Sequence, residues 1–173
     1  LGRRRVRGAD FEIQYSLPLS RLGFASNGVL ALRALATYTS ELSYDDGGGR
    51  VDQAGALAGL PRVRGYGSIS YANGPLIAHL GARYVGSADR DNTDLPLEFE
   101  PDHFPSQVYL DASLQYSIRS AASRKVQLFA GVSNLLDKDP VLTGEDVFFS
   151  MATNPRYYDV IGRSYNAGVR VQF

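Results

Sequence analysis

The chain has 173 residues, of which 18 are basic and 18 acidic, so its formal net charge is zero. This balance disfavours a nucleic-acid partner, because phosphate binding normally requires a basic excess. The absence of cysteine from the sequence excludes disulfides, thiolate metal sites and a cysteine nucleophile. The only two histidines, His79 and His103, are far apart in the chain, which argues against a multi-histidine zinc site.

The chain begins with Leu1, Gly2 and a basic run, Arg3, Arg4 and Arg5, that no apolar segment follows. We therefore expect no secretory leader here, and we interpret the run as a solvated strand or tail. No stretch of the sequence approaches the roughly 18 apolar residues that a membrane-spanning helix requires.

Seven segments with alternating apolar and polar residues follow one another along the chain, and none has a convincing helical pattern. A period of two predicts β-strands with one apolar and one polar face. In chain order, the apolar faces consist of Phe11, Ile13, Tyr15 and Leu17; Leu30, Leu32, Ala34, Ala36 and Tyr38; Val63, Gly65, Gly67, Ile69 and Tyr71; Leu76, Ala78, Leu80, Ala82 and Tyr84; Val108, Leu110, Ala112, Leu114, Tyr116 and Ile118; Val126, Leu128, Ala130 and Val132; and Tyr165, Ala167, Val169, Val171 and Phe173.

The connections between these segments alternate strictly in length. Residues 19–28, 73–75 and 120–124 form the shorter ones, and residues 44–61, 86–106 and 135–162 the long ones. A barrel threaded through a bilayer has this asymmetry, with short turns on one side and long loops on the outer side. The sequence therefore predicts a transmembrane β-barrel segment whose apolar face contacts lipid.

The polar faces carry charged residues within the strands, namely Glu12, Arg33, Arg83 and Asp111. An unpaired charge in a sealed core is costly, whereas a wet lumen tolerates it. Tyrosines near the strand ends suit an aromatic girdle at the membrane interface: Tyr15, Tyr38, Tyr71, Tyr84, Tyr116 and Tyr165. The alternative of a soluble β-sandwich binding module would explain the tyrosines but not the loop asymmetry.

Two C-terminal segments, residues 128–140 and 157–173, resemble the end of TonB-dependent outer-membrane receptors. In that family an Asn-Leu-(Leu/Phe)-Asp sequence leads into the last extracellular loop, and Tyr-Asp-x-x-Gly-Arg opens the final strand, which ends on an aromatic residue. Arg7-Gly8-x-Asp10-x-Glu12 resembles the Gly-x-Glu-x-Glu strand opening of the family, with aspartate in place of the first glutamate. The residues here that match the C-terminal motif are Asn134, Leu135, Asp137, Tyr158, Asp159, Gly162 and Arg163.

The resemblance implies a receptor that imports a scarce nutrient, such as a ferric siderophore, through a barrel of about 22 strands around a plug. A chain of 173 residues is too short for that assembly, so we expect residues 1–173 to be its last seven or so strands, without the plug or the TonB box. The expected fold is all-β: an incomplete antiparallel barrel segment, either an open curved sheet or a strained closure of the first strand on the last.

The expected location is the Gram-negative outer membrane, and the expected partners are outer-membrane lipid and lipopolysaccharide, the barrel-assembly machinery and the rest of the receptor. TonB itself would be reached only through the missing N-terminal part. The resemblance implies that Tyr165, Ala167, Val169, Val171 and Phe173 form the signal that the assembly machinery recognises. Strand addition at an open sheet edge is the physical basis of such recognition.

One long connection is a candidate ligand-contact or metal-binding loop because it is rich in acidic residues. These are Asp89, Asp91, Asp94, Glu98, Glu100 and Asp102. Their spacing matches no recognised calcium loop, and a solvated surface is the simpler interpretation. The other long loops, 44–61 and 141–155, are ligand-contacting by resemblance only.

No spacing of serine, histidine and carboxylate residues indicates catalysis, so we expect no catalytic residue, no cofactor and no resident metal. An outer-membrane lipase or protease is the enzymatic alternative, and it would need a serine–histidine pair at one rim. A self-contained small outer-membrane barrel with a structural or adhesive role is the main non-enzymatic alternative.

Overall fold

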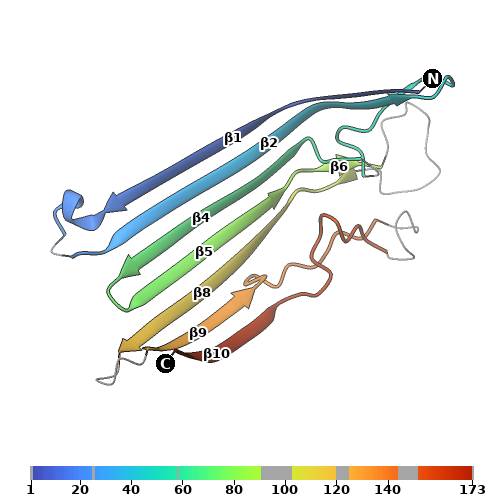
Figure 1. The fold of residues 1–173 in the computed structure, drawn as a ribbon. Helices are drawn as coiled ribbons and strands as arrows, with labels where there is room; N and C mark the ends of the chain where they lie inside the picture. The colour runs from blue at the N-terminus through green and yellow to red at the C-terminus, as the bar shows by residue number, and fades with distance from the viewer. Residues whose placement is uncertain are drawn as a thin grey trace.

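The computed structural model describes residues 2–24, 26–57, 59–90, 103–119, 125–143 and 152–172. One antiparallel sheet dominates this part of the chain (Figure 1). Its strands follow the chain order as a meander: β1 (Arg3–Pro18), β2 (Val29–Asp45), β4 (Val63–Asn73), β5 (Leu76–Val85), β8 (Gln107–Arg119), β9 (Lys125–Ser133) and β10 (Ser164–Gln172). All seven predicted strands are therefore present.

Four short elements lie in the connections and were not predicted. Strand β3 (Arg50–Asp52) pairs with the end of β2, while β6 (Ala88–Asp89) and β7 (His103–Phe104) form a separate two-stranded sheet. The 3₁₀-helix η1 (Leu19–Leu22) lies between β1 and β2. Among the described residues, no helix is long and apolar enough to cross a membrane.

Strands β1 and β2 are longer than the sequence predicted. They pair from Arg3 opposite Asp45 to Pro18 opposite Val29, whereas the alternation suggested a start near Asp10 and an end at Tyr38. The extra length carries arginines and polar residues instead of an apolar face, which is why the alternation did not reveal it.

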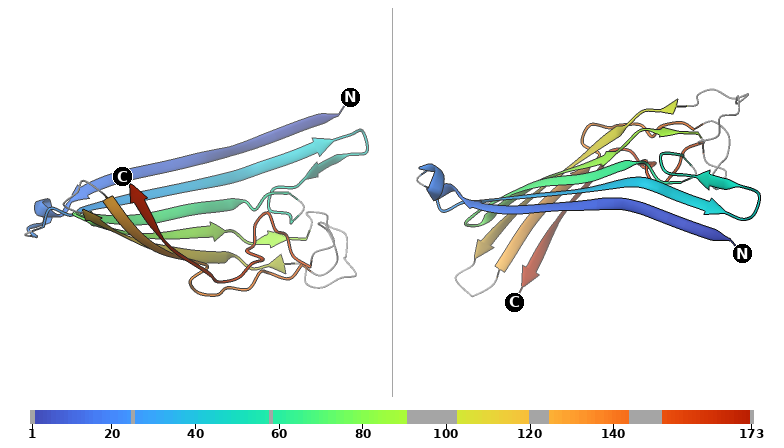
Figure 2. Two further views of the ribbon diagram at one scale, coloured as in Figure 1. Left: turned by 60° about the horizontal axis from the view of Figure 1, so that its bottom comes forward. Right: turned by 90° about the horizontal axis from the view of Figure 1, so that it is seen from above.

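The sheet is curved and open (Figure 2). Strands β1 and β10 stand at the two ends of the strand order, and the pairings between described strands do not join them. The expectation of an incomplete barrel with an open curved sheet is confirmed, and the alternative of strained closure is wrong. The reason is geometric, since closed bacterial barrels contain at least about eight strands and usually an even number.

The register of the sheet places all seven predicted apolar faces on one surface, which we call the apolar face. Across the sheet, Tyr15 pairs with Leu32, Leu32 with Ile69, and Ile69 with Leu80. The row continues from Leu80 to Ala112 and then to Val132. Directly opposed residues share one side of a sheet, so this surface is continuous. Its large side chains are exposed, with Ile13 at 69%, Val169 at 61% and Leu114 at 49%.

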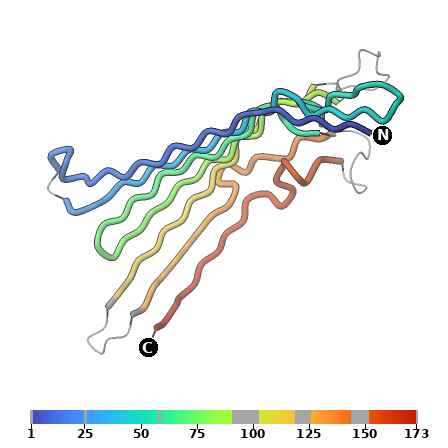
Figure 3. The backbone as a smooth tube through the Cα atoms, turned by 45° about the horizontal axis from the view of Figure 1, so that its top comes forward, coloured from blue at the N-terminus to red at the C-terminus, as the bar shows by residue number. Residues whose placement is uncertain are grey.

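The two ends of the sheet differ, as the loop lengths predicted (Figure 3). The C-terminal end of β10 lies at the end with the short turns, and the long connections and the start of β1 lie at the other, which we call the loop end. The predicted girdle tyrosines divide between these ends. Tyr15, Tyr71 and Tyr116 lie toward the short turns, and Tyr38, Tyr84 and Tyr165 toward the loop end.

The aromatic residue Phe129 lies on the polar face of the sheet, and its strand pairing explains why it is there. Phe129 pairs with Gly168 of β10, and a Cβ atom at Gly168 would overlap the Phe129 ring. The ring therefore covers the bare backbone of the glycine, a known way to stabilise glycine in strands.

The regular pairing of β1 with β2 is interrupted once, between Arg7 and Gly8. Arg7 lies opposite Glu41 and Gly8 opposite Thr39, so β2 contains one extra residue, Ser40, in a β-bulge. A Cβ atom at Gly8 would overlap the backbone oxygen of Tyr38. Glycine is therefore required for the close approach of the two strands.

The substitution Gly8→Ala should lower the stability of the β1–β2 pair by about 1–3 kcal/mol, the usual cost of overpacking. The measurement is thermal unfolding of the detergent-solubilised protein. Gly67→Ala is the matched control, because the nearest atom to an added Cβ there is the Arg33 oxygen at 4.0 Å. Equal unfolding temperatures for the two variants would contradict the requirement at Gly8.

Candidate functional site

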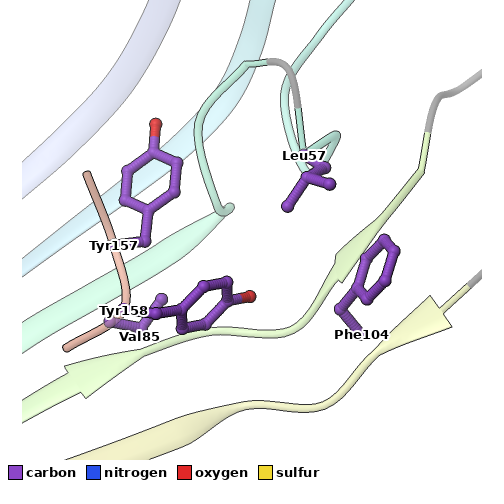
Figure 4. Packing of buried hydrophobic residues seen from close by; sticks show 5 residues of the cluster. All are labelled: Leu57, Val85, Phe104, Tyr157 and Tyr158. Atoms are coloured by element: carbon purple, nitrogen blue, oxygen red, sulfur yellow. The ribbon is translucent and has the colours of Figure 1, made fainter. Parts of the chain in front are cut away.

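The apolar cluster of buried residues lies at the loop end, where the long connections meet the end of β5 (Figure 4). It consists of Leu57, Val85, Phe104, Tyr157 and Tyr158, each at most 8% exposed. We call this cluster the loop core. It combines residues from three long connections with the end of β5, so the loops form one packed unit.

Hydrogen bonds to backbone oxygens reinforce the loop core. The Leu57 backbone amide donates to the backbone carbonyl oxygen of Asp89 at 2.7 Å. The Asp89 backbone amide donates to the carbonyl oxygen of Gly55 at 2.8 Å. The Asn154 side-chain amide donates to the Leu57 oxygen at 3.2 Å, and the Tyr157 hydroxyl donates to the Gly59 oxygen. These bonds join loops that are distant in sequence, which explains why the sequence analysis missed the cluster.

Burial raises the pKa of both Tyr157 and Tyr158 above the ordinary tyrosine value. The folded loop core thus favours the neutral phenols. Its contribution to stability is complete below the unfolded pKa, near 10, and is lost as the pH rises through the higher folded values.

We expect the full-length protein to lose the loop core reversibly in alkali, above about pH 10. Tyrosinate absorbance should show late ionisation of the buried phenols, and protease cleavage in the loops should increase over the same interval. Tyr157→Phe and Tyr158→Phe should each remove one late group. The control Tyr165→Phe alters an exposed residue, so a loss of late ionisation in that variant would contradict the assignment.

The predicted motif residues at the two ends of the last long connection come together around Asn134. Asn134 is 2% exposed and has a φ of 51°. Its backbone amide donates to Asp111 at 2.9 Å, and its side-chain amide donates to Asp159 and to the Lys138 oxygen, both at 2.9 Å. Its side-chain oxygen accepts the Lys138 amide at 2.9 Å.

A second set of contacts joins Asp137 to Arg163. The Asp137 carboxylate accepts the Arg163 backbone amide and one guanidinium nitrogen, both at 3.1 Å. Arg163 also donates to the Leu135 oxygen at 3.4 Å, and Gly162 has a φ of 81°. These contacts and those of Asn134 form what we call the latch, which closes the base of the last loop. Tyr158, the remaining motif residue, lies in the loop core instead.

Asn134→Ala should open the latch, because it removes three side-chain hydrogen bonds of a residue that is 2% exposed, each worth about 0.5–1.5 kcal/mol. Limited proteolysis of the full-length protein should then cut within residues 135–163 several-fold faster. Asn166→Ala serves as the control, since Asn166 is exposed on β10. Unchanged cleavage of the Asn134 variant would show that the latch does not hold the loop.

The remaining predicted site residues are only partly within the described structure. Asp89 accepts a hydrogen bond from His103 at 2.7 Å, while Asp91, Asp94, Glu98, Glu100 and Asp102 lie outside the described residues. Among the described residues, no group of three or more histidine, cysteine or acidic residues is placed to hold a metal ion. Tyr165, Ala167, Val169 and Val171 lie on the apolar face of β10, and Phe173 is outside the described part.

A hollow of about 350 Å³ lies beside the loop core, and we call it the arginine pocket. Its lining includes Arg64, Arg83 and Arg156 together with Tyr66 and Tyr157, and no acidic residue from the described part of the chain contributes to it. The Arg83 guanidinium donates to the backbone carbonyl oxygen of Tyr157 at 2.6 Å. It also lies 4.5 Å from the centre of the Tyr109 ring. The sequence analysis noted Arg83 only as a charge on the polar face.

A family model described as TonB dependent receptor-like, beta-barrel, matches residues 1–135. The match includes β1 to β9 together with Asn134 and Leu135, and it stops before β10. Comparisons with curated proteins and with solved structures gave no match.

Proposed function

The chain belongs to the family of TonB-dependent receptor-like β-barrels, and from this premise we propose that it forms the C-terminal barrel portion of a receptor that imports a scarce nutrient, such as a ferric siderophore. The observation that carries the proposal is the continuous apolar face, whose large side chains are exposed on a single sheet. Such a surface suits lipid, and the opposite face suits a polar lumen.

The polar face supports this assignment because its charges are not sealed in a core. Glu12 and Arg33 form an ion pair of 2.9 Å between β1 and β2, with both side chains about half exposed. Thr37 donates to Asp10 at 2.7 Å on the same pair of strands. Ion pairs and hydroxyl contacts of this kind suit a wall that faces water.

The family is one of outer-membrane receptors, and we place this chain in the outer membrane of a Gram-negative cell. The loop end then faces the exterior, because long loops are extracellular in such barrels and short turns are periplasmic. Lipid and lipopolysaccharide would surround the apolar face.

We assign residues 1–173 to the last seven or so strands of the receptor. The unpaired edges of β1 and β10 favour this assignment over a self-contained small barrel, because an exposed strand edge in lipid leaves backbone groups without partners. The other strands would pair with these edges, and the plug would fill the lumen. TonB would act on the N-terminal part. The function proposed here is that of a receptor and not of an enzyme, because the family is one of transporters and receptors.

The test is uptake by the organism that encodes the chain. Deleting the gene for the whole receptor should abolish TonB-dependent accumulation of one labelled nutrient under limitation, and restoring the gene should recover it. A panel of ferric siderophores, cobalamin and oligosaccharides covers the nutrients that the family resemblance implies. Unchanged accumulation across the panel would contradict the import function.

We further propose that the end of the last strand is the recognition signal for the barrel-assembly machinery. Deleting Phe173 should reduce the amount of heat-modifiable receptor in the outer membrane several-fold, because the aromatic end of the strand is lost. Phe173→Tyr keeps the ring and should assemble normally. Normal assembly of the deletion variant would refute this role.

A further inference from the structure

We propose that the arginine pocket binds an anionic, oxygen-rich group, such as a carboxylate or phosphate, of the transported nutrient. This inference rests on the proposed import function and adds to it the chemical class of the substrate. The pocket lies at the loop end, where strands β4 and β5 meet the last long connection.

The first argument is uncompensated charge. Arg64 and Arg83 both line the pocket, no acidic residue of the described ranges contributes to its lining, and no described carboxylate lies within 4.0 Å of either guanidinium. Elsewhere on the polar face, Arg33 has its own partner in Glu12 at 2.9 Å. Clustered cations without a counterion attract an anion, and the low-dielectric wall of a cleft strengthens that attraction.

The second argument concerns an unused donor. The Nε atom of Arg64 is buried and, within the described residues, has no hydrogen-bond partner. Buried donors are nearly always paired, so an exception indicates a missing partner. A guanidinium group is also the side chain best suited to a planar oxyanion, because its nitrogens donate two parallel hydrogen bonds.

The third argument is that the pocket is already organised. The Arg83 guanidinium is held between the backbone carbonyl oxygen of Tyr157, at 2.6 Å, and the centre of the Tyr109 ring, at 4.5 Å. Tyr157 is itself held in the loop core, so the packed loops set the position of the guanidinium. The volume of about 350 Å³ is that of a small-molecule site, and preorganised donors lower the entropic cost of binding.

The experiment measures binding of citrate and of inorganic phosphate to the full receptor in detergent by isothermal titration calorimetry. Arg64→Gln should weaken the binding of at least one of these anions by about tenfold or more, since it removes a charge and its donors. Arg64→Lys keeps the charge and should recover part of the affinity. The matched control is Arg170→Gln, which removes a polar-face arginine that donates to Gln127 at 3.3 Å and lines a different hollow.

Each outcome decides the proposal. Stronger binding of citrate than of phosphate identifies a carboxylate ligand, and the reverse identifies a phosphate ligand. Absence of anion binding, or equal weakening by the Arg64 and Arg170 changes, would overturn the inference. If a carboxylate of the plug already occupies the pocket, neither citrate nor phosphate would bind, and the inference would be overturned. A heat-modifiability assay verifies that each variant is folded.

Failure of the arginine pocket and failure of the proposed import function give different experimental results. Loss of nutrient accumulation on gene deletion, together with unchanged anion binding in the Arg64 variant, would leave the receptor assignment intact and remove only the pocket. Arg64-dependent anion binding without any nutrient uptake would retain the pocket and refute the import function.

Discussion

Cross-strand pairing is the constraint on which the rest of this structure depends. In a bilayer no water satisfies the backbone, so each amide and carbonyl of a spanning strand must bond to a neighbouring strand. The register that achieves this also fixes the side chains, because a slip of one residue would turn the apolar set of a strand to the polar face. The row that runs from Tyr15 through Leu32 and Val132 to Tyr165 shows that each pair of neighbouring strands places apolar residues opposite one another. The bulge opposite Gly8 lies beyond Tyr38, where the apolar face has already ended.

The polar face is not uniform along the strands. Toward the middle of β1 and β2, charges are paired across the strands, as in Glu12 and Arg33. At the loop end, Arg64 and Arg83 have no described carboxylate partner, and Arg83 is held by a carbonyl and an aromatic ring. The first arrangement suits a solvated wall, whereas the second suits a site that is completed by another group.

The long loops are organised by two different interactions. The loop core buries Leu57, Phe104 and Tyr157 among residues of other loops, which contributes hydrophobic stabilisation outside the sheet. The latch uses hydrogen bonds and the positive φ values of Asn134 and Asp137 to turn the chain out of β9 and back into β10. Asparagine and aspartate tolerate this conformation better than other non-glycine residues do.

The sequence by itself determined the strands, the identity of their faces and the uneven loop lengths, because these depend on a period of two that each segment carries alone. The sequence also indicated the latch residues, because Asn134 and Arg163 belong to the C-terminal motif. It did not indicate which contacts these residues make. Only the tertiary structure decided that the sheet stays open, that Tyr157 and Tyr158 are buried, and that Arg64 and Arg83 line one pocket. Those features depend on side chains brought together from distant segments, and no local pattern records which loops will meet.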